Sequence, residues 1–175
     1  MNKANSIKTS SKSNAWSIEQ SEQIYRVNRW GNGYFEIGEN GNLHVIPRYD
    51  QPKLKIDLRE IVDEMSATGI QFPAVIRFHD ILRSQVEQLN KAFRHTIEEA
   101  HYEGKYLGVF PVKVNQMREV IEEIVSAGAR FDYGLEAGSK PELIAALAYN
   151  TNKNSLTILN GYKDEEYLRL ALLGL

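Results

Sequence analysis

The sequence YLGVFPVKVN, residues 106–115, decides the fold that we predict for this chain. Its apolar residues run almost without interruption, and the first charge in the stretch is Lys113. Such a run is typical of a parallel strand covered on both faces, because an antiparallel strand with one wet face would alternate. We therefore predict a buried strand that presents Lys113 at its end.

Lys113 would then stand at the edge of the core, where its amine is only partly hydrated. Partial desolvation favours the neutral form of an amine, which is the nucleophilic form. The ordinary alternative is a solvated loop lysine, since most lysines face water. From position alone we favour that ordinary alternative.

The chain from residue 72 onward repeats an order of strand and helix. Four β–α units in succession call for a parallel sheet with helical cover. The pattern by itself does not separate a doubly wound sheet from half of an eight-stranded barrel. Besides the strand before Lys113, we predict strands at residues 74–78, 131–135 and 156–159.

Helix start signals separate these strands. Ser139 with Glu142 three residues later forms a capping box, and Pro141 lies in the first turn, where it costs little. We expect Leu143, Ile144 and Leu147 to face the core from this helix. Asp57, Asp80 and Asp164 are predicted to begin three other helices. The long helix after Asp80 has an expected buried stripe of Leu82, Val86, Leu89, Phe93 and Ile97.

The N-terminal third has a different organisation. Residues 1–15, MNKANSIKTSSKSNA, lack an apolar centre and are typical of a disordered tail. A weak helix signal follows at residues 17–27. Two alternating runs then flank the turn sequence GENGN, residues 38–42, and predict a β-hairpin.

Composition excludes several classes of function. The 21 Lys and Arg nearly balance the 23 Asp and Glu, for a net charge of −2, so nothing indicates a nucleic-acid or anionic-membrane partner. The absence of cysteine excludes disulfides, thiolate metal sites and a cysteine nucleophile. No apolar run approaches the ~20 residues that span a bilayer. The 4 histidines are scattered without ligand spacing, so we predict no metal site.

Three motifs together are far more specific than any of these signals. FPVKVNQ, GLEAGSKPEL and NGYKDEEYLRLAL follow one another in the chain. In this order and spacing they resemble the biosynthetic arginine decarboxylases, pyridoxal phosphate (PLP) enzymes of the alanine-racemase-like class. The resemblance covers residues 25–175. It implies that Lys113 forms an imine with PLP and thereby reverses the interpretation from position alone.

The resemblance also implies a fold. The four β–α units would be the first half of a PLP-binding (β/α)₈ TIM-type barrel, preceded by a β-hairpin that belongs to a β-domain. We expect a disordered tail at residues 1–24, the hairpin and a helix at 25–70, and the truncated barrel at 71–175. Barrel chemistry occurs at the carboxyl ends of strands, where Lys113, Glu136 and Asn160 would fall.

Glu136 is the second candidate catalytic residue. Related basic-amino-acid decarboxylases have an acidic residue beside the cofactor lysine at its position, where a carboxylate would tune the amine. The alternative is a helix-entry carboxylate that favours the positive end of the helix dipole. Glu142 also matches an acidic position, but we favour its capping role. Lys140 and Lys163 are expected to be solvated or structural.

The resemblance implies conversion of L-arginine to agmatine and CO₂ in polyamine (spermidine) biosynthesis, with PLP and Mg²⁺ as cofactors. We expect a cytoplasmic homo-oligomer with no membrane or nucleic-acid partner. The alternatives are a decarboxylase of another basic amino acid and a non-catalytic, partner-binding relative. Because the chain stops inside a helical pattern, we expect an N-terminal fragment that is inactive alone. The family's phosphate-binding, ring-stacking and substrate-binding residues would lie beyond Leu175.

Overall fold

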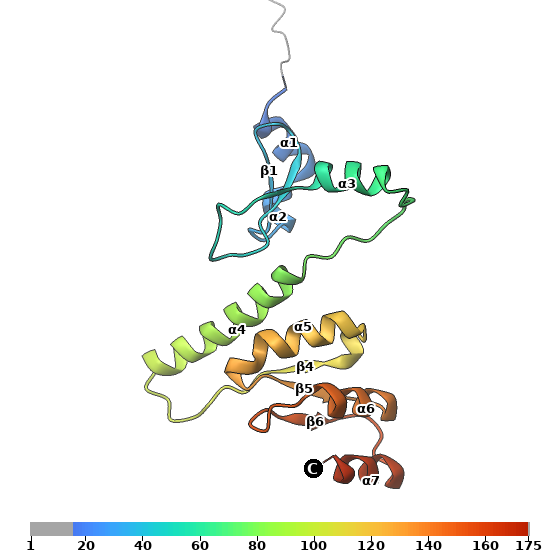
Figure 1. Cartoon of the computed structure of the whole chain (residues 1–175). Coiled ribbons are helices and arrows are strands. Elements are labelled where there is room, and N and C mark those ends of the chain that lie inside the picture. The colour runs from blue at the N-terminus through green and yellow to red at the C-terminus, as the bar shows by residue number, and fades with distance from the viewer. Residues whose placement is uncertain (1–15, 175) are drawn as a thin grey trace, which may run out of the picture. The chain divides into compact units, whose positions relative to one another are not determined.

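The computed structural model describes residues 16–174 (Figure 1). Residues 1–15, most of the predicted tail, lie outside the described residues. The described residues divide into two compact units, one of residues 16–46 and 55–71 and one of residues 47–54 and 72–174. The predicted boundaries at residues 24 and 70 stay predictions.

The first unit contains a small antiparallel sheet. Strand β1 pairs with β2 so that Phe35 lies opposite Val45, which confirms the predicted hairpin. A short third strand, β3, was not predicted and pairs with the other side of β2. Ser17 caps a helix that overlaps the segment predicted as tail. The elements are α1 (Ile18–Tyr25), α2 (Val27–Trp30), β1 (Phe35–Ile37), β2 (Leu43–Val45), β3 (Ile56–Asp57) and α3 (Leu58–Ala67).

The second unit contains a parallel sheet in the order β4-β5-β6. Each strand is joined to the next by a crossover helix, as βαβ units require. The register sets Pro111 opposite Glu136, and Glu136 opposite Ile158. The elements are α4 (His79–Glu99), β4 (Val109–Pro111), η1 (Val112–Val114), α5 (Arg118–Gly128), η2 (Ala129–Phe131), β5 (Gly134–Ala137), α6 (Lys140–Tyr149), β6 (Thr157–Leu159) and α7 (Glu165–Leu173).

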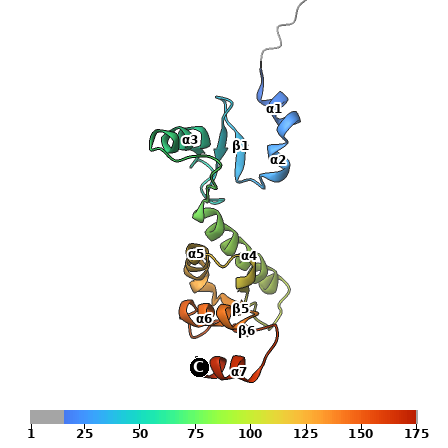
Figure 2. The same cartoon turned by 90° about the vertical axis from the view of Figure 1, so that its right-hand side faces the viewer.

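Helices α5 and α6 lie along the sheet (Figure 2), and the core of this unit lies between these helices and β5. Leu135 and Ala137 of the central strand are fully buried there. They pack against residues from α5, α6 and α7, among them Ile121, Leu143 and Tyr167. Full burial of a leucine side chain is worth roughly 1.5–3 kcal/mol, so these contacts fix the positions of the helices on β5. A second cluster, around Val86, Val120 and Ile124, joins α4 to α5.

Several sequence predictions about this unit were wrong in detail. Residues 74–78 form no strand, because an extended segment becomes a strand only where a neighbour accepts its hydrogen bonds. Helix α4 begins at His79, so Asp80 lies in its first turn instead of capping it. The third predicted strand begins three residues later, at Gly134, because the chain makes a 3-10 turn over η2 and Asp132 takes a left-handed conformation.

The predicted core faces of two helices were only partly right. Val86 of α4 is buried, whereas Leu89 and Phe93 on the same stripe are 42% and 46% exposed. Phe93 instead stacks on Tyr106, with ring centroids 4.0 Å apart. On α6, Leu143 is fully buried as predicted, but Ile144 is 58% exposed. Helix periodicity marks an apolar stripe, and only the neighbouring elements decide how much of it is covered.

Candidate active site

Lys113 lies just beyond the carboxyl end of β4. The strand stops at Pro111, and the 3-10 turn η1 carries Lys113 between two valines. Val112 is 1% exposed and anchors the turn in the core, while the Lys113 side chain is 62% exposed. The strand is therefore shorter than predicted, and among the described residues the Lys113 amine is less buried than predicted.

Glu136 lies within β5, not after it as predicted. Successive strand residues point to opposite faces, so Glu136 faces away from the core that holds Leu135 and Ala137. Its Oε1 atom is 4.0 Å from the Nζ atom of Lys113. A partly exposed pair of this kind contributes roughly 0–1 kcal/mol to stability. Glu136 therefore contributes little to stability through this pair, and its main effect is to place a negative charge beside the exposed Lys113 amine.

Asn160 completes this cluster from the end of β6. Its side-chain nitrogen donates to Oε1 of Glu136 at 3.0 Å. Its side-chain oxygen accepts the backbone N–H of Gly161 at 2.8 Å. The three residues predicted at the carboxyl ends of the strands are thus brought together by the parallel register. Asn160 was predicted at this edge, without a role.

Glu142 forms hydrogen bonds with the loop after β4 and the loop after β5. Its backbone N–H donates to Ser139 Oγ at 3.4 Å, which is the predicted cap of α6. Its Oε2 atom accepts the Gly138 N–H at 2.7 Å, and its Oε1 atom accepts from Gln116 Nε2 at 3.2 Å. Glu142 therefore has a structural role that extends beyond its own helix. Gln116 was given no role, and its place as the last residue of the FPVKVNQ motif was the signal for it.

The other two lysines of the motifs are engaged structurally. Lys140 forms ion pairs with Glu166 and with Asp164, the latter at 2.9 Å. The hydrogen bonds to Glu166 and Asp164 raise the pKa of Lys140, so its amine is held in the charged, non-nucleophilic form. Lys163 donates to the backbone carbonyl of Gly161 at 3.1 Å. Both of these amines are held by direct contacts, whereas the Lys113 amine lies 4.0 Å from Glu136 Oε1.

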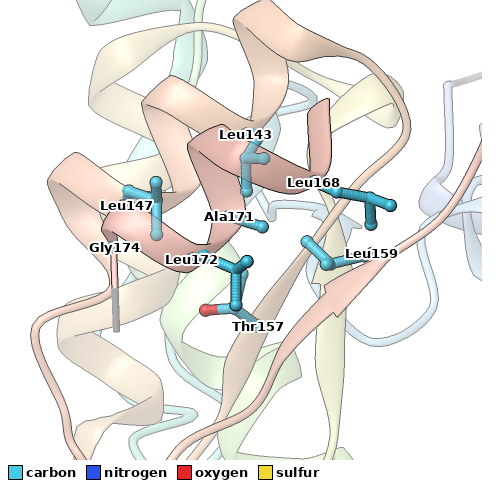
Figure 3. Close-up of a pocket in the computed structure, with 8 residues that line it drawn as sticks. All are labelled: Leu143, Leu147, Thr157, Leu159, Leu168, Ala171, Leu172 and Gly174. Atoms are coloured by element: carbon cyan, nitrogen blue, oxygen red, sulfur yellow. The ribbon is translucent and has the colours of Figure 1, made fainter. Parts of the chain in front are cut away.

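A groove of about 310 Å³ lies elsewhere in this unit, between α6, β6 and α7 (Figure 3). Neither Lys113 nor Glu136 lines it. Its walls hold one polar side chain, that of Thr157, and therefore do not suit a charged cofactor such as PLP. The lining residues are Leu143, Leu147, Thr157, Leu159, Leu168, Ala171, Leu172 and Gly174.

The cluster at the strand ends, in contrast, fits PLP. The cofactor carries an aldehyde, and an exposed primary amine is the group that captures an aldehyde reversibly. The amine of Lys113 meets this requirement, with the carboxylate of Glu136 beside it. The parallel sheet with crossover helices makes this an α/β protein, and Lys113 and Glu136 lie at the carboxyl edge, where such folds place their ligand sites.

Comparison with known proteins identifies the class more closely. The family described as "Pyridoxal-dependent decarboxylase, pyridoxal binding domain" matches residues 82–174, more than half of the chain. The chain belongs to this family, which confirms the predicted α/β portion of a barrel and the dependence on PLP.

Individual relatives share one name. The biosynthetic arginine decarboxylase of Bacteroides thetaiotaomicron is 47% identical over 159 residues, which are 91% of this chain and 25% of the relative. That of Gloeobacter violaceus is 48% identical over 91% of this chain and 24% of the relative. The crystal structure of the biosynthetic arginine decarboxylase SpeA from Campylobacter jejuni matches with a TM-score of 0.78 and 32% identity, covering 86% of this chain and 24% of that one. This chain spans about a quarter of the length of these relatives.

Within residues 16–174, no helix is both long and apolar enough to cross a membrane.

Proposed function

We propose that this chain is part of a PLP-dependent arginine decarboxylase that converts L-arginine to agmatine and CO₂ in polyamine (spermidine) biosynthesis. The observation that carries the proposal is the Lys113 amine beside the Glu136 carboxylate at the carboxyl edge of a parallel sheet. Relatives named biosynthetic arginine decarboxylase, 47–48% identical over 91% of the chain, support arginine as the substrate. The proposal concerns the longer protein, of which this chain would supply one portion of the active site.

Two residues would have distinct roles in this reaction. Lys113 would hold PLP through its amine, and PLP, when bound, supplies the electron sink for the carbanion that remains when CO₂ leaves. Glu136 would orient the Lys113 side chain and stabilise positive charge on its nitrogen. The 4.0 Å separation between the two side chains permits this electrostatic influence without a direct hydrogen bond.

Three further features belong to the proposal. We infer that the whole enzyme uses Mg²⁺, assembles as a homo-oligomer and acts in the cytoplasm. No three His, Asp or Glu side chains among residues 16–174 lie close enough together to hold a metal ion, so we assign no Mg²⁺ ligand to this chain. Activity of the full-length enzyme after chelation and after re-addition of Mg²⁺ tests the first feature, and light scattering tests the second.

The proposal is tested on the full-length protein that contains this sequence. Borohydride reduction with PLP bound, followed by peptide mapping, should place the pyridoxyl group on Lys113. The same protein should release CO₂ from labelled arginine faster than from ornithine or lysine. A label on Lys140 or Lys163 would refute the assignment of Lys113. Preference for ornithine or lysine would refute arginine as the substrate.

The role of Glu136 has a separate test. Glu136→Gln is nearly isosteric and should leave the fold unchanged, but it removes the charge beside Lys113. We expect kcat to fall by about ten- to a thousand-fold, the range that a positioned polar group supplies. Wild-type kcat with an unchanged cofactor spectrum would show that Glu136 is only a structural carboxylate.

A further inference from the structure

Three polar groups of Asn160 form hydrogen bonds: its backbone N–H, its side-chain oxygen and its side-chain nitrogen. Its backbone N–H donates to the Ala137 carbonyl at 2.8 Å and so extends the β5–β6 pairing by one residue. Its side-chain oxygen accepts the Gly161 N–H at 2.8 Å, and its side-chain nitrogen donates to Glu136 Oε1 at 3.0 Å. One residue thus connects the backbone of β5, the turn after β6 and the Glu136 carboxylate.

The orientation of this amide follows from its partners. The backbone N–H of Gly161 can only donate, so the atom that faces it must be the amide oxygen. The amide nitrogen is then directed to Glu136, which as a carboxylate can only accept. The turn itself is closely specified, because Gly161 has φ +73° and an added Cβ would lie 2.1 Å from the Gly138 carbonyl oxygen.

The contact matters because it involves the carboxylate oxygen that faces Lys113. Glu136 Oε1 accepts the Asn160 hydrogen bond and is also the atom 4.0 Å from Lys113 Nζ. That distance exceeds the 2.7–3.2 Å of a direct hydrogen bond. Without the hydrogen bond from Asn160, the Glu136 carboxylate would be stabilised by rotating into direct contact with the Lys113 ammonium group. The Lys113 amine would then be less available to an incoming aldehyde.

We propose that Asn160 is a positioning residue that holds the Glu136 carboxylate beside, but not directly on, the Lys113 amine. The proposal rests on the proposed function, because it gives that amine to a cofactor. Asn160 acts through Glu136 and not on the reacting atoms.

Asn160→Asp separates positioning from a merely structural role. Aspartate is isosteric and still accepts the Gly161 N–H, so the turn is kept. It cannot donate to Glu136, and it sets a second negative charge against that carboxylate. The lost hydrogen bond and the repulsion between the two carboxylates both free Glu136 to move toward Lys113. Two carboxylates near the Lys113 amine would also favour its charged form.

The chain contains a matched control at Asn152. The side-chain nitrogen of Asn152 donates to Asp132 Oδ1 at 3.0 Å and to the Ala129 carbonyl at 3.1 Å, and its oxygen accepts the Asn154 N–H at 3.0 Å. This repeats the arrangement of Asn160, an amide between a backbone N–H and a carboxylate. Asn152 precedes β6 and Asn160 follows it, so the control lies at the opposite end of the sheet from Lys113. Asn152→Asp loses two donated hydrogen bonds where Asn160→Asp loses one, so it should disturb the fold at least as much without affecting the cofactor.

The experiment uses the full-length protein. Asn160→Asp should weaken PLP retention and lower kcat/KM by about ten- to a hundred-fold, the loss commonly seen when the partner of a site residue is removed. In the cofactor-free protein, acylation of Lys113 by an amine-directed reagent, read by peptide mass, should become slower. Asn152→Asp should match the wild type in PLP retention and in Lys113 acylation.

Each outcome decides the question. If Asn160→Asp and Asn152→Asp give the same PLP retention and the same Lys113 acylation, Asn160 is structural and the inference is wrong. If the wild-type protein neither binds PLP nor releases CO₂, the proposed function fails and the inference fails with it. If Asn160→Asp does not fold, Asn160→Ala, which removes the donor without adding a charge, is compared with Asn152→Ala by the same two readouts, and the same two results decide the question.

Discussion

Replacing Gly161 by alanine should loosen the carboxyl ends of β5 and β6. At φ +73° an L-residue costs about 1–2 kcal/mol relative to glycine. The new Cβ would also lie 2.1 Å from the Gly138 carbonyl oxygen, whereas ordinary contacts begin at 3.4 Å. Gly138 cannot easily move away, because its N–H donates to Glu142 at 2.7 Å. Overpacking of this kind costs about 1–3 kcal/mol, so we expect a total loss of about 2–5 kcal/mol.

Hydrogen exchange read by mass spectrometry provides the measurement. A local loss of 2 kcal/mol or more should speed exchange of peptides from β5, β6 and α7 by about 30-fold or more. Peptides from β1 and β2 belong to the other compact unit and provide the internal reference. Gly138→Ala is the matched control, because its Cβ would meet only the Glu142 carboxylate, at 3.4 Å. We expect that variant to exchange almost as the wild type does.

The comparison of the two alanine variants can refute the reasoning. Equal exchange in Gly161→Ala and Gly138→Ala would mean that the two loops do not approach as closely as described. The steric basis for the fixed orientation of Asn160 would then be lost. Faster exchange in β1 and β2 as well would indicate a general loss of structure instead of a local clash.

Three further predictions concern other parts of the chain. Tyr167→Phe should lower the local free energy of unfolding by only about 1 kcal/mol, measured by the same exchange method. The Ala137 carbonyl that accepts the buried Tyr167 hydroxyl also accepts the Asn160 N–H and so keeps a partner, and a much larger loss would contradict this. Hydrogen bonds lower the pKa of Asp57 from 3.8 to about 2, chiefly that from the Asn42 side chain, with smaller contributions from the Asn40 side chain and the Arg59 backbone. The unfolded state therefore binds the Asp57 proton more tightly than the folded state does. The stability that Asp57 adds to the first unit should therefore be complete above about pH 4 and lost toward pH 2, and Asp57→Asn should remove this step from the acid titration of tryptophan fluorescence. Residues 1–175 alone should hold PLP poorly and release no CO₂ from labelled arginine, because β6 is paired on one edge only among the described residues; turnover by a chain that light scattering finds monodisperse would contradict this.

Local signals in the sequence determined most of the helices and the hairpin. Ser139, Pro141 and Glu142 predicted the start of α6, and Asp164 predicted the start of α7, because a cap is made by residues three or four positions apart. The hairpin of β1 and β2 was predictable for the same reason, since its turn residues lie between its strands. The motif around Lys113 likewise indicates a PLP enzyme without any geometry.

The tertiary structure alone decided which polar side chains meet. Asn160 and Glu136 are 24 residues apart, and Gln116 and Glu142 are 26 apart, so no local pattern could pair them. Their contacts depend on the parallel register of β4, β5 and β6, which is set when the crossover helices pack on the sheet. The same dependence explains why residues 74–78, with a strand-like sequence, form no strand. Caps and turns are properties of neighbouring residues, whereas a ladder and a site exist only where distant segments supply the partners.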